Sequence, residues 1–354
     1  MAEAFKDTRI LVVGGAGFVG SNLVRMLLVK EVDKVVVVDN LLSSEQENLP
    51  EDKRIDFRLG SIIDDTILGG IDDSFDYVFH LATYHGNQSS IHDPLSDHEN
   101  NTLTTLKLYW HMRDFKRLKR LVYSAAGCAV AAKTEGEARA TAEDAPVALE
   151  MDSPYSISKI IGEFYSVYFH RQHKLPTVRA RFQNVYGPGE VLGAGQWRGT
   201  PATVWRNVTP TFIYKALKGE SLPLQNEGNA SRDFIYVEDI CRGLMLCAER
   251  GRPGAVYNLA SGVETTVREL AETINRLTGN PASPTLLPRR PWDHSIHRFG
   301  STEKASKELG FEAQIPLEKG LRRTVAWTRE NLARIEAAMD KHERHLARTE
   351  SQRD

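Results

Sequence analysis

The sequence predicts an α/β fold in which a doubly wound, mostly parallel sheet is joined to a smaller C-terminal α/β part. In the first half, short apolar or β-branched runs alternate with stretches of helical period. Several of these runs are almost continuously apolar, which is typical of parallel strands covered by helices on both faces. At 354 residues the chain is too long for one minimal domain and too short for three.

The strands expected in this sheet are residues 10–13, 35–38, 55–59, 77–81, 121–124 and 177–181. A stretch rich in Gly, Trp and Pro follows at 193–210, and its length predicts a lid or substrate loop. Beyond it we expect helices at 212–217, 240–249, 267–278 and 320–334, and strands at 234–237 and 256–260.

The overall charge predicts no partner of extreme charge. Forty-five Lys and Arg against 47 Asp and Glu leave a net charge of −2, so nothing recruits nucleic acid or an anionic membrane. The three cysteines, Cys128, Cys241 and Cys247, have no metal-ligand spacing and favour a reducing compartment. The N-terminus carries no apolar signal region, and no run approaches the roughly 20 apolar residues of a membrane helix. We expect a soluble, cytoplasmic protein without a metal site.

A glycine motif follows the first strand. Gly14, Gly17 and Gly20 lie between that strand and an amphipathic stretch, as in Rossmann-type dinucleotide sites, where glycines let the backbone approach a pyrophosphate at a helix N-terminus. Asp39 ends the second strand about 20 residues later, where a carboxylate can accept a hydrogen bond from a ribose 2′-hydroxyl. A 2′-phosphate there would meet a repulsion of up to about 4 kcal/mol, so NAD is favoured over NADP. The alternative is that the glycines only make a turn and Asp39 caps the strand.

Tyr155 and Lys159 lie four residues apart in a helical stretch and share one face. A nearby ammonium group stabilises a phenolate, so Tyr155 could accept a hydroxyl proton while a carbon gives hydride to NAD. Ser124 ends the preceding strand and is a further catalytic candidate. Such a pair can also belong to an ordinary helix face.

Together these residues resemble the extended short-chain dehydrogenase/reductase family, and within it the NAD-dependent nucleotide-sugar epimerases and dehydratases. The resemblance spans about residues 9–329 and rests on these motifs: Gly14-x-x-Gly17-x-x-Gly20, Asp39-Asn40, His80-Leu81-Ala82, Asn101, Tyr155-x-x-x-Lys159, Arg181-Phe182-x-Asn184-x-Tyr186-Gly187-Pro188 and Arg232-Asp233-Phe234-Ile235-x-Val237-x-Asp239.

The resemblance implies two groups of binding residues. The expected NAD contacts are Gly14, Gly17, Phe18, Val19, Gly20, Asp39, Asn40, Ser61, Ile62, Leu81, Ala82, Asn101, Tyr155 and Lys159. The expected substrate contacts are Asn184, Arg232 and Arg290 at the diphosphate and Asp293 at the nucleoside ribose. His85 is added because it follows the fourth strand's C-terminal end, where ligands bind in open α/β sheets. Each arginine could instead form a surface ion pair, and His85 could be an exposed loop residue.

The sequence departs from the family pattern after the fifth strand. Ala126 aligns with a Ser or Thr that usually contacts the sugar 4-hydroxyl, and Gly127-Cys128 replaces the Asp-Glu pair of 4,6-dehydratases. GDP-mannose 3,5-epimerases have an acid/base cysteine at the position of Cys128, and a thiol with a pKa of about 8.5 can be tuned to that role. Their partner lysine is missing, because this stretch offers Arg206, Asn207 and Val208. Cys128 could also be a small buried residue without a role.

We therefore expect an NAD-dependent epimerase that transiently oxidises C4 of a UDP-, GDP- or dTDP-hexose, with inversion at C4, or at C3 or C5 with Cys128. The alternatives are a 4,6-dehydratase or decarboxylase of the same family, and a non-catalytic NAD-binding regulator. The expected regions are an NAD-binding Rossmann domain at 1–186, with 233–262 returning to it, a nucleotide-sugar-binding domain at 187–330 and a charged, solvated tail at 331–354. The resemblance also implies a homodimer that pairs helices around 102–115 and 155–170, and a place in polysaccharide synthesis.

Overall fold

A seven-stranded parallel sheet is the centre of the computed structural model, which describes residues 2–127, 138–147, 149–290 and 296–350. Its strand order is β10-β6-β5-β4-β1-β2-β3, so the chain starts in the middle and winds outward in both directions. The strands are β1 Arg9–Val13, β2 Lys34–Asp39, β3 Ile55–Leu59, β4 Tyr77–His80, β5 Arg120–Ala126, β6 Thr177–Phe182 and β10 Val256–Leu259. The predicted Rossmann-type fold is confirmed.

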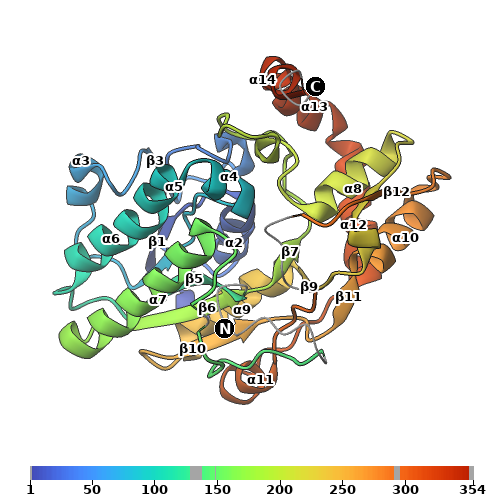
Figure 1. Cartoon of the computed structure of the whole chain (residues 1–354). Helices are drawn as coiled ribbons and strands as arrows, with labels where there is room; N and C mark the ends of the chain where they lie inside the picture. Colours follow the sequence, from blue (N-terminus) through green and yellow to red (C-terminus); the bar gives the residue numbers. More distant parts are fainter. Residues whose placement is uncertain (1, 128–137, 148, 291–295, 351–354) are drawn as a thin grey trace.

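Helices cover both faces of this sheet (Figure 1). On one face, α2 (Phe18–Leu28) and α9 (Val237–Arg250) pack together over β1, β2 and β6, and share a core with those strands. On the other face lie α3 (Asp65–Gly69), α6 (Thr104–Met112) and α7 (Pro154–His173). Parallel strands bring all their carboxyl ends to one edge, where ligands bind in such sheets.

A smaller α/β part lies beside that edge, with its own core (Figure 1). It contains a three-stranded sheet, β11-β9-β7, and a two-stranded parallel sheet, β12-β8. These strands are β7 Asn184–Tyr186, β8 Pro223–Gln225, β9 Ser231–Tyr236, β11 Glu264–Thr266 and β12 Thr285–Leu287, and the helices are α8 Val208–Leu217, α10 Val267–Thr278 and α12 Leu317–Glu330. Within the region 233–262, α9 and β10 lie with the large sheet, whereas β9 belongs to the small one.

Short helices complete the described chain: α1 Ala2–Phe5, α4 Asn87–His92, α5 Pro94–Asp97 and α11 Glu303–Leu309, with a π-helical turn over His98–Leu103 that leads into α6. None of the helices among the described residues is both long and apolar enough to cross a membrane.

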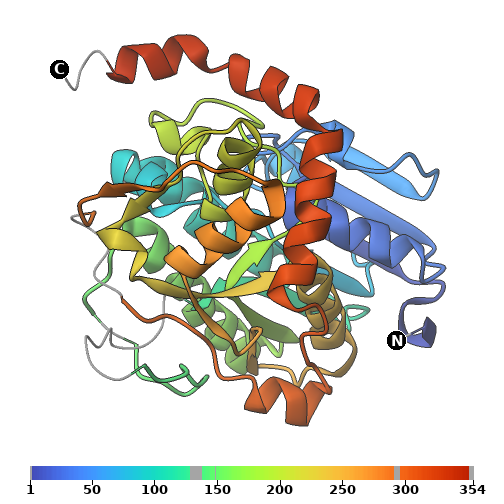
Figure 2. The ribbon, with the colours of Figure 1, turned by 90° about the vertical axis from the view of Figure 1, so that its right-hand side faces the viewer.

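The C-terminal region is helical, and it is more closely packed than the solvated or fraying terminal helix expected from its charge. The predicted helix 320–334 ends at Glu330, and Asn331 separates α12 from α13 (Leu332–Asp340), which is followed by α14 (Glu343–Glu350). Ile335 and Ala338 of α13 are buried against a small apolar cluster of the loop after β7. Figure 2 shows α13 and α14 running across one end of the molecule. The interleaved charges conceal this contact in the sequence because few apolar residues of α13 make it, namely Ile335, Ala338 and Met339.

Candidate active site

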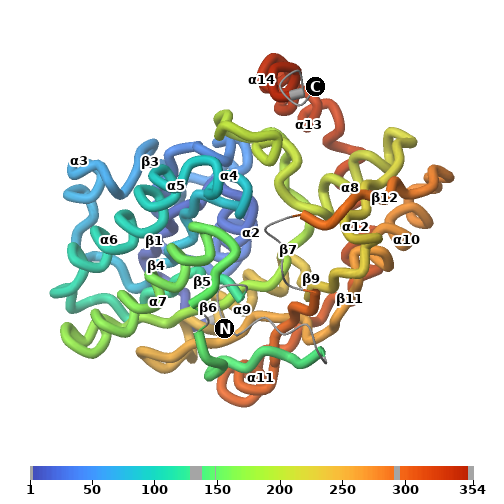
Figure 3. The backbone as a smooth tube through the Cα atoms, viewed as in Figure 1, coloured from blue at the N-terminus to red at the C-terminus, as the bar shows by residue number. Residues whose placement is uncertain are grey.

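A cavity of about 940 Å³ opens at the carboxyl edge of the large sheet, between this sheet and the smaller part. Its size is that of a site for a large organic ligand. The walls come from the glycine turn after β1, the ends of β2, β4 and β5, the start of α7, and the loop between β7 and α8. Figure 3 shows this loop, which reaches from the smaller part towards α4. The predicted substrate loop therefore forms one wall.

The glycine turn leaves no room for a side chain at Gly14 or Gly20. Gly14 has a φ of 84°, and a Cβ on it would lie 2.4 Å from the Ala82 nitrogen. A Cβ on Gly20 would lie 2.2 Å from the Gly14 carbonyl oxygen. No side chain caps the N-terminus of α2, where Gly17 is the N-cap residue. This close backbone, next to the positive end of a helix, fits a pyrophosphate.

Asp39 lines the cavity and also holds its walls together. Its carboxylate accepts hydrogen bonds of 2.9 Å from the backbone nitrogens of Ala16 and Leu41 and from Ser44 Oγ. Burial raises the pKa of Asp39, and these hydrogen bonds act in the opposite direction. Asp39 thus caps the strand end, as in the alternative, and it also lines the cavity in which a ribose would bind.

Helix α7 presents Tyr155 and Lys159 to the same cavity. Ser153 is its N-cap and accepts a hydrogen bond from the Ser156 nitrogen, and Ser90 Oγ accepts one from the Tyr155 nitrogen. Lys159 is 3% exposed, donates to the Ser124 carbonyl oxygen at 2.9 Å, and has its Nζ 5.8 Å from the centre of the Tyr155 ring. The ammonium group is thereby held beside the phenol.

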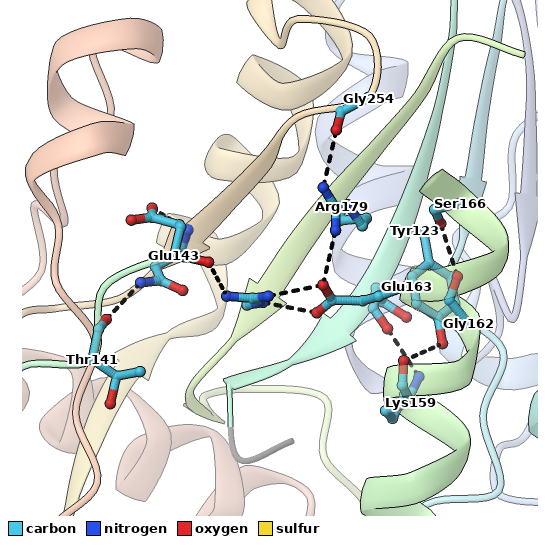
Figure 4. Close-up of polar contacts among 12 residues, drawn as sticks. Tyr123, Thr141, Glu143, Lys159, Gly162, Glu163, Ser166, Arg179 and Gly254 are labelled. Atoms are coloured by element: carbon cyan, nitrogen blue, oxygen red, sulfur yellow. Dashed lines mark hydrogen bonds and ion pairs between the residues drawn. The ribbon is translucent and has the colours of Figure 1, made fainter. Parts of the chain in front are cut away.

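A buried ion-pair network fixes α7 to β6 (Figure 4). Glu163, 2% exposed, accepts from Arg181 Nε at 2.8 Å and Nη2 at 2.9 Å, and from Arg179 Nη1 at 3.2 Å. Arg181 Nη1 also donates to the Glu143 carbonyl oxygen at 2.9 Å. Glu163 is one turn beyond Lys159, so this network anchors to β6 the part of α7 that follows Tyr155 and Lys159.

His85 lies close to Tyr155, with ring centres 5.9 Å apart in an edge-to-face arrangement. Its Nε2 donates to Asn207 Oδ1 at 3.1 Å, and Asn207 Nδ2 donates to Glu190 Oε1. Burial lowers the pKa of His85 to about 4 and raises that of Glu190 to about 7. His85 is therefore a neutral imidazole in the cavity wall, and the alternative of an exposed loop residue is wrong.

Most of the expected binding residues meet in this one cavity. Those that line it are Gly14, Gly17, Phe18, Val19, Gly20, Asp39, Asn40, Ser61, Ile62, Leu81, Ala82, Ser124, Tyr155, Lys159, Asn184, Arg232, Arg290 and His85. Cys128 and Asp293 lie outside the described residues. Arg206, Arg289 and Arg298 also line the cavity and add positive charge to its walls.

Comparison with known proteins decides the family. The model of the NAD dependent epimerase/dehydratase family matches residues 10–260. The chain belongs to this family. NAD, the cofactor predicted from Asp39 and fitted by the glycine turn, is confirmed by this membership.

Several relatives of this epimerase/dehydratase are known. The Bordetella bronchiseptica enzyme WbmF, solved in complex with NAD+ and UDP, is 61% identical with a TM-score of 0.88, over 98% of this chain and 99% of that one. A UDP-glucose 4-epimerase from Mycolicibacterium smegmatis is 30% identical over 91% of this chain and 98% of its own length. A dTDP-glucose 4,6-dehydratase from Streptomyces niveus is 30% identical over 92% and 94%, respectively.

Two expected residues have surroundings that bear on their roles in this family member. Asn101 does not line the cavity. Its side chain accepts from the Tyr84 nitrogen at 2.7 Å and donates to Ser158 Oγ at 3.1 Å, so it ties the loop after β4 to α7. Ala126 and Ile160 form a small buried cluster against which Tyr155 packs, so the position where the family pattern has a hydroxyl is apolar.

Sequence reasoning missed Glu190 and Arg298, and it assigned no place in the site to Arg206, Asn207 and Val208, which line the cavity. Arg298 lines the cavity and pairs with Asp152, with Nη2 and Oδ2 2.9 Å apart. Glu190 directly follows Gly187-Pro188-Gly189, and an acid that opens a long functional loop was the signal available for it.

Proposed function

We propose that this protein is an NAD-dependent nucleotide-sugar epimerase that works through transient oxidation at C4 of the hexose. The observation that carries the proposal is the meeting of Tyr155, Lys159 and the glycine turn in one cavity. The relatives support a nucleotide sugar as substrate, because WbmF was solved with UDP and a Thermotoga maritima UDP-glucose 4-epimerase with UDP-glucose.

In this mechanism Tyr155 accepts the proton of the sugar 4-hydroxyl. The Lys159 ammonium stabilises the phenolate electrostatically, and its hydrogen bond to the Ser124 carbonyl keeps it in place. Bound NAD would take up the hydride from C4 and return it later. The 4-ketone acidifies the protons at C3 and C5, so inversion at C4 and inversion at a neighbouring carbon both remain open to this site.

The diphosphate would bind among the guanidinium groups of Arg232, Arg289 and Arg290, which line the far side of the cavity. A chain with a net charge of −2 needs such a local cluster to hold a dianionic group. This placement leaves the hexose next to Tyr155 and His85.

The test is incubation of the purified protein with UDP-, GDP- and dTDP-hexoses in deuterated water, with the ring protons followed by NMR. Inversion at C4 without deuterium uptake indicates 4-epimerisation, and uptake at C3 or C5 indicates an enolate. Loss of the 6-hydroxyl indicates a dehydratase, and loss of CO2 from a hexuronate in the panel a decarboxylase. Tyr155→Phe should abolish every change. NAD binding with no change for any sugar would refute the proposal and favour a non-catalytic regulator.

We also propose that the protein is a homodimer through α6 and α7. Four large apolar side chains of these helices are exposed by 46–57%: Trp110, Ile157, Phe164 and Tyr168. An exposed apolar patch of this kind is typical of a protein interface. Sedimentation should give a dimer at micromolar concentration, and Phe164→Glu should give a monomer. A monomeric wild type would refute this proposal.

A further inference from the structure

We propose that His85 is a second acid/base in the cavity, that it acts through Nδ1 on the carbon next to the C4 ketone, and that Asn207 and Glu190 position it. The inference rests on the proposed function, because it needs a ketone at C4. It starts from the hydrogen-bonded chain that runs from Glu190 through Asn207 to the imidazole of His85.

This chain determines which ring nitrogen of His85 carries the proton. In the structure the Asn207 amide NH2 group donates to Glu190 Oε1, which turns the Asn207 amide oxygen towards His85. That oxygen can only accept, so His85 Nε2 must be the protonated nitrogen. Nδ1 is then a free lone pair, and it makes no hydrogen bond with any described residue. Nδ1 is therefore the ring nitrogen of His85 that can accept a proton.

The surroundings keep the imidazole neutral and in place. Burial is the main factor that lowers the pKa of His85, the charges of Arg198, Arg206 and Lys159 lower it further, and the hydrogen bond to Asn207 acts in the opposite direction. Arg198, 4% exposed, donates from Nη1 to the His85 carbonyl oxygen at 3.2 Å and to Ser43 Oγ at 3.1 Å. The loop that carries His85 is thereby tied to the loop after β2.

The position of His85 is that of a second proton-transfer group. Its ring meets the Tyr155 ring at 78°, with the centres 5.9 Å apart, and both side chains line the cavity. Tyr155 acts at the 4-hydroxyl of the sugar. Because the His85 ring lies beside the Tyr155 ring, we infer that the imidazole reaches a carbon next to C4. The stretch before α8 contains no lysine that could act as an acid, but it contains Asn207. The Asn207 side chain binds the imidazole of His85, which comes from the loop after β4.

The step balances as follows. The C–H bond at the carbon next to the ketone breaks, its proton passes to Nδ1, and its electron pair moves into the enolate with the negative charge on the C4 oxygen. A water molecule on the other face donates a proton to the same carbon, which inverts this carbon and leaves hydroxide. The imidazolium then releases its proton to solvent, which restores that donor.

The first experiment separates proton transfer at carbon from hydride transfer. With a sugar that the wild type turns over in deuterated water, His85→Gln should reduce deuterium uptake at C3 or C5 by 100-fold or more. Reduction of the bound cofactor, followed by its absorbance, should continue. Tyr155→Phe should abolish both. His98→Gln is the matched control, because His98 is exposed on the π-helical turn, and it should change neither.

The positioning residues are tested by a conservative pair of variants. Glu190→Ala should slow deuterium uptake, whereas Glu190→Gln should restore it, because the Gln amide oxygen can still accept from Asn207. Equal rates in His85→Gln and wild type would refute the inference. Wild-type turnover by C4 inversion without uptake would also refute it, and would leave the proposed function intact.

A second measurement requires no substrate. Nitrogen-15 NMR of labelled histidines, with His85→Gln used for assignment, should show Nε2 protonated and Nδ1 unprotonated at pH 7. Asn207→Ala should shift this tautomer balance, while His98→Gln should not. An Nδ1-protonated or doubly protonated His85 in the wild type would overturn the inference even if no sugar in the panel reacts.

Discussion

The Glu163 network should be the most sensitive polar feature of the fold. Glu163→Ala removes the carboxylate between Arg179 and Arg181, whose side chains are only 15% and 5% exposed. Three hydrogen bonds are lost, and two guanidinium groups are left in a poorly solvated site. Breaking a buried ion pair in this way costs about 3–5 kcal/mol. We expect the free energy of unfolding to fall by that amount.

Urea unfolding at a fixed saturating NAD concentration measures the change through the shift of the midpoint at constant slope. The control is Glu31→Ala, since Glu31 pairs with Lys6 at 3.6 Å and both side chains are more than half exposed. Such a surface pair contributes about 1 kcal/mol or less. Adding Arg181→Met to Glu163→Ala should recover part of the loss, because one unpaired charge disappears. A loss below about 1 kcal/mol for Glu163→Ala would contradict the reasoning.

Two further predictions concern the cavity wall. Gly20→Ala places a Cβ 2.2 Å from the Gly14 carbonyl oxygen, and it should weaken NAD binding by 100-fold or more, as measured by calorimetry. The control is Gly69→Ala, which should bind NAD normally because nothing lies within 4 Å of the added Cβ. Equal affinities would mean that the turn relaxes freely. Burial raises the pKa of Glu190 from 4.5 to about 7, so the folded protein binds this proton more tightly than the unfolded chain does. The free energy of unfolding of the wild type should therefore fall as pH rises between these two values. The slope is about 1.4 kcal/mol for each pH unit, and the total is up to about 3 kcal/mol. Glu190→Gln should therefore be the more stable protein in urea at pH 8 and gain nothing at pH 4, and a gain that is independent of pH would contradict this.

The parts of the site that sequence predicts well are those set by local geometry. Gly14 and Gly20 are required by one tight turn, and Tyr155 and Lys159 by one turn of helix, so their spacing along the chain fixes their spacing in space. The continuously apolar runs predicted the large sheet for the same reason, since burial on both faces leaves a direct trace in composition.

The parts that sequence could not predict depend on contacts between distant segments. His85 and Asn207 are separated by 122 positions and meet only because the loop before α8 folds back over the loop after β4. Asn101 matches a cofactor motif, but its amide is used by the backbone of Tyr84 and the hydroxyl of Ser158. No periodicity encodes either arrangement, because each is determined by tertiary packing.

The C-terminal helices show how the wall of the site depends on residues far from the chemistry. The loop that carries Glu190 continues into Val191 and Leu192, which are buried against Ile335 of α13. Arg334 and Lys341 reach Glu45, in the loop after the strand that ends in Asp39. Helix α13 thus contacts both the loop after β7 and the loop after β2. Arg206 links the same two loops, because it donates to the carbonyl oxygens of Ala194 and Ser43. Asn207, which orients the His85 ring, directly follows Arg206 in the chain. The orientation of this ring and the wall on the cofactor side of the cavity therefore depend on the same packing of the two loops against α13. The C-terminal helix is thus part of the scaffold of the active site.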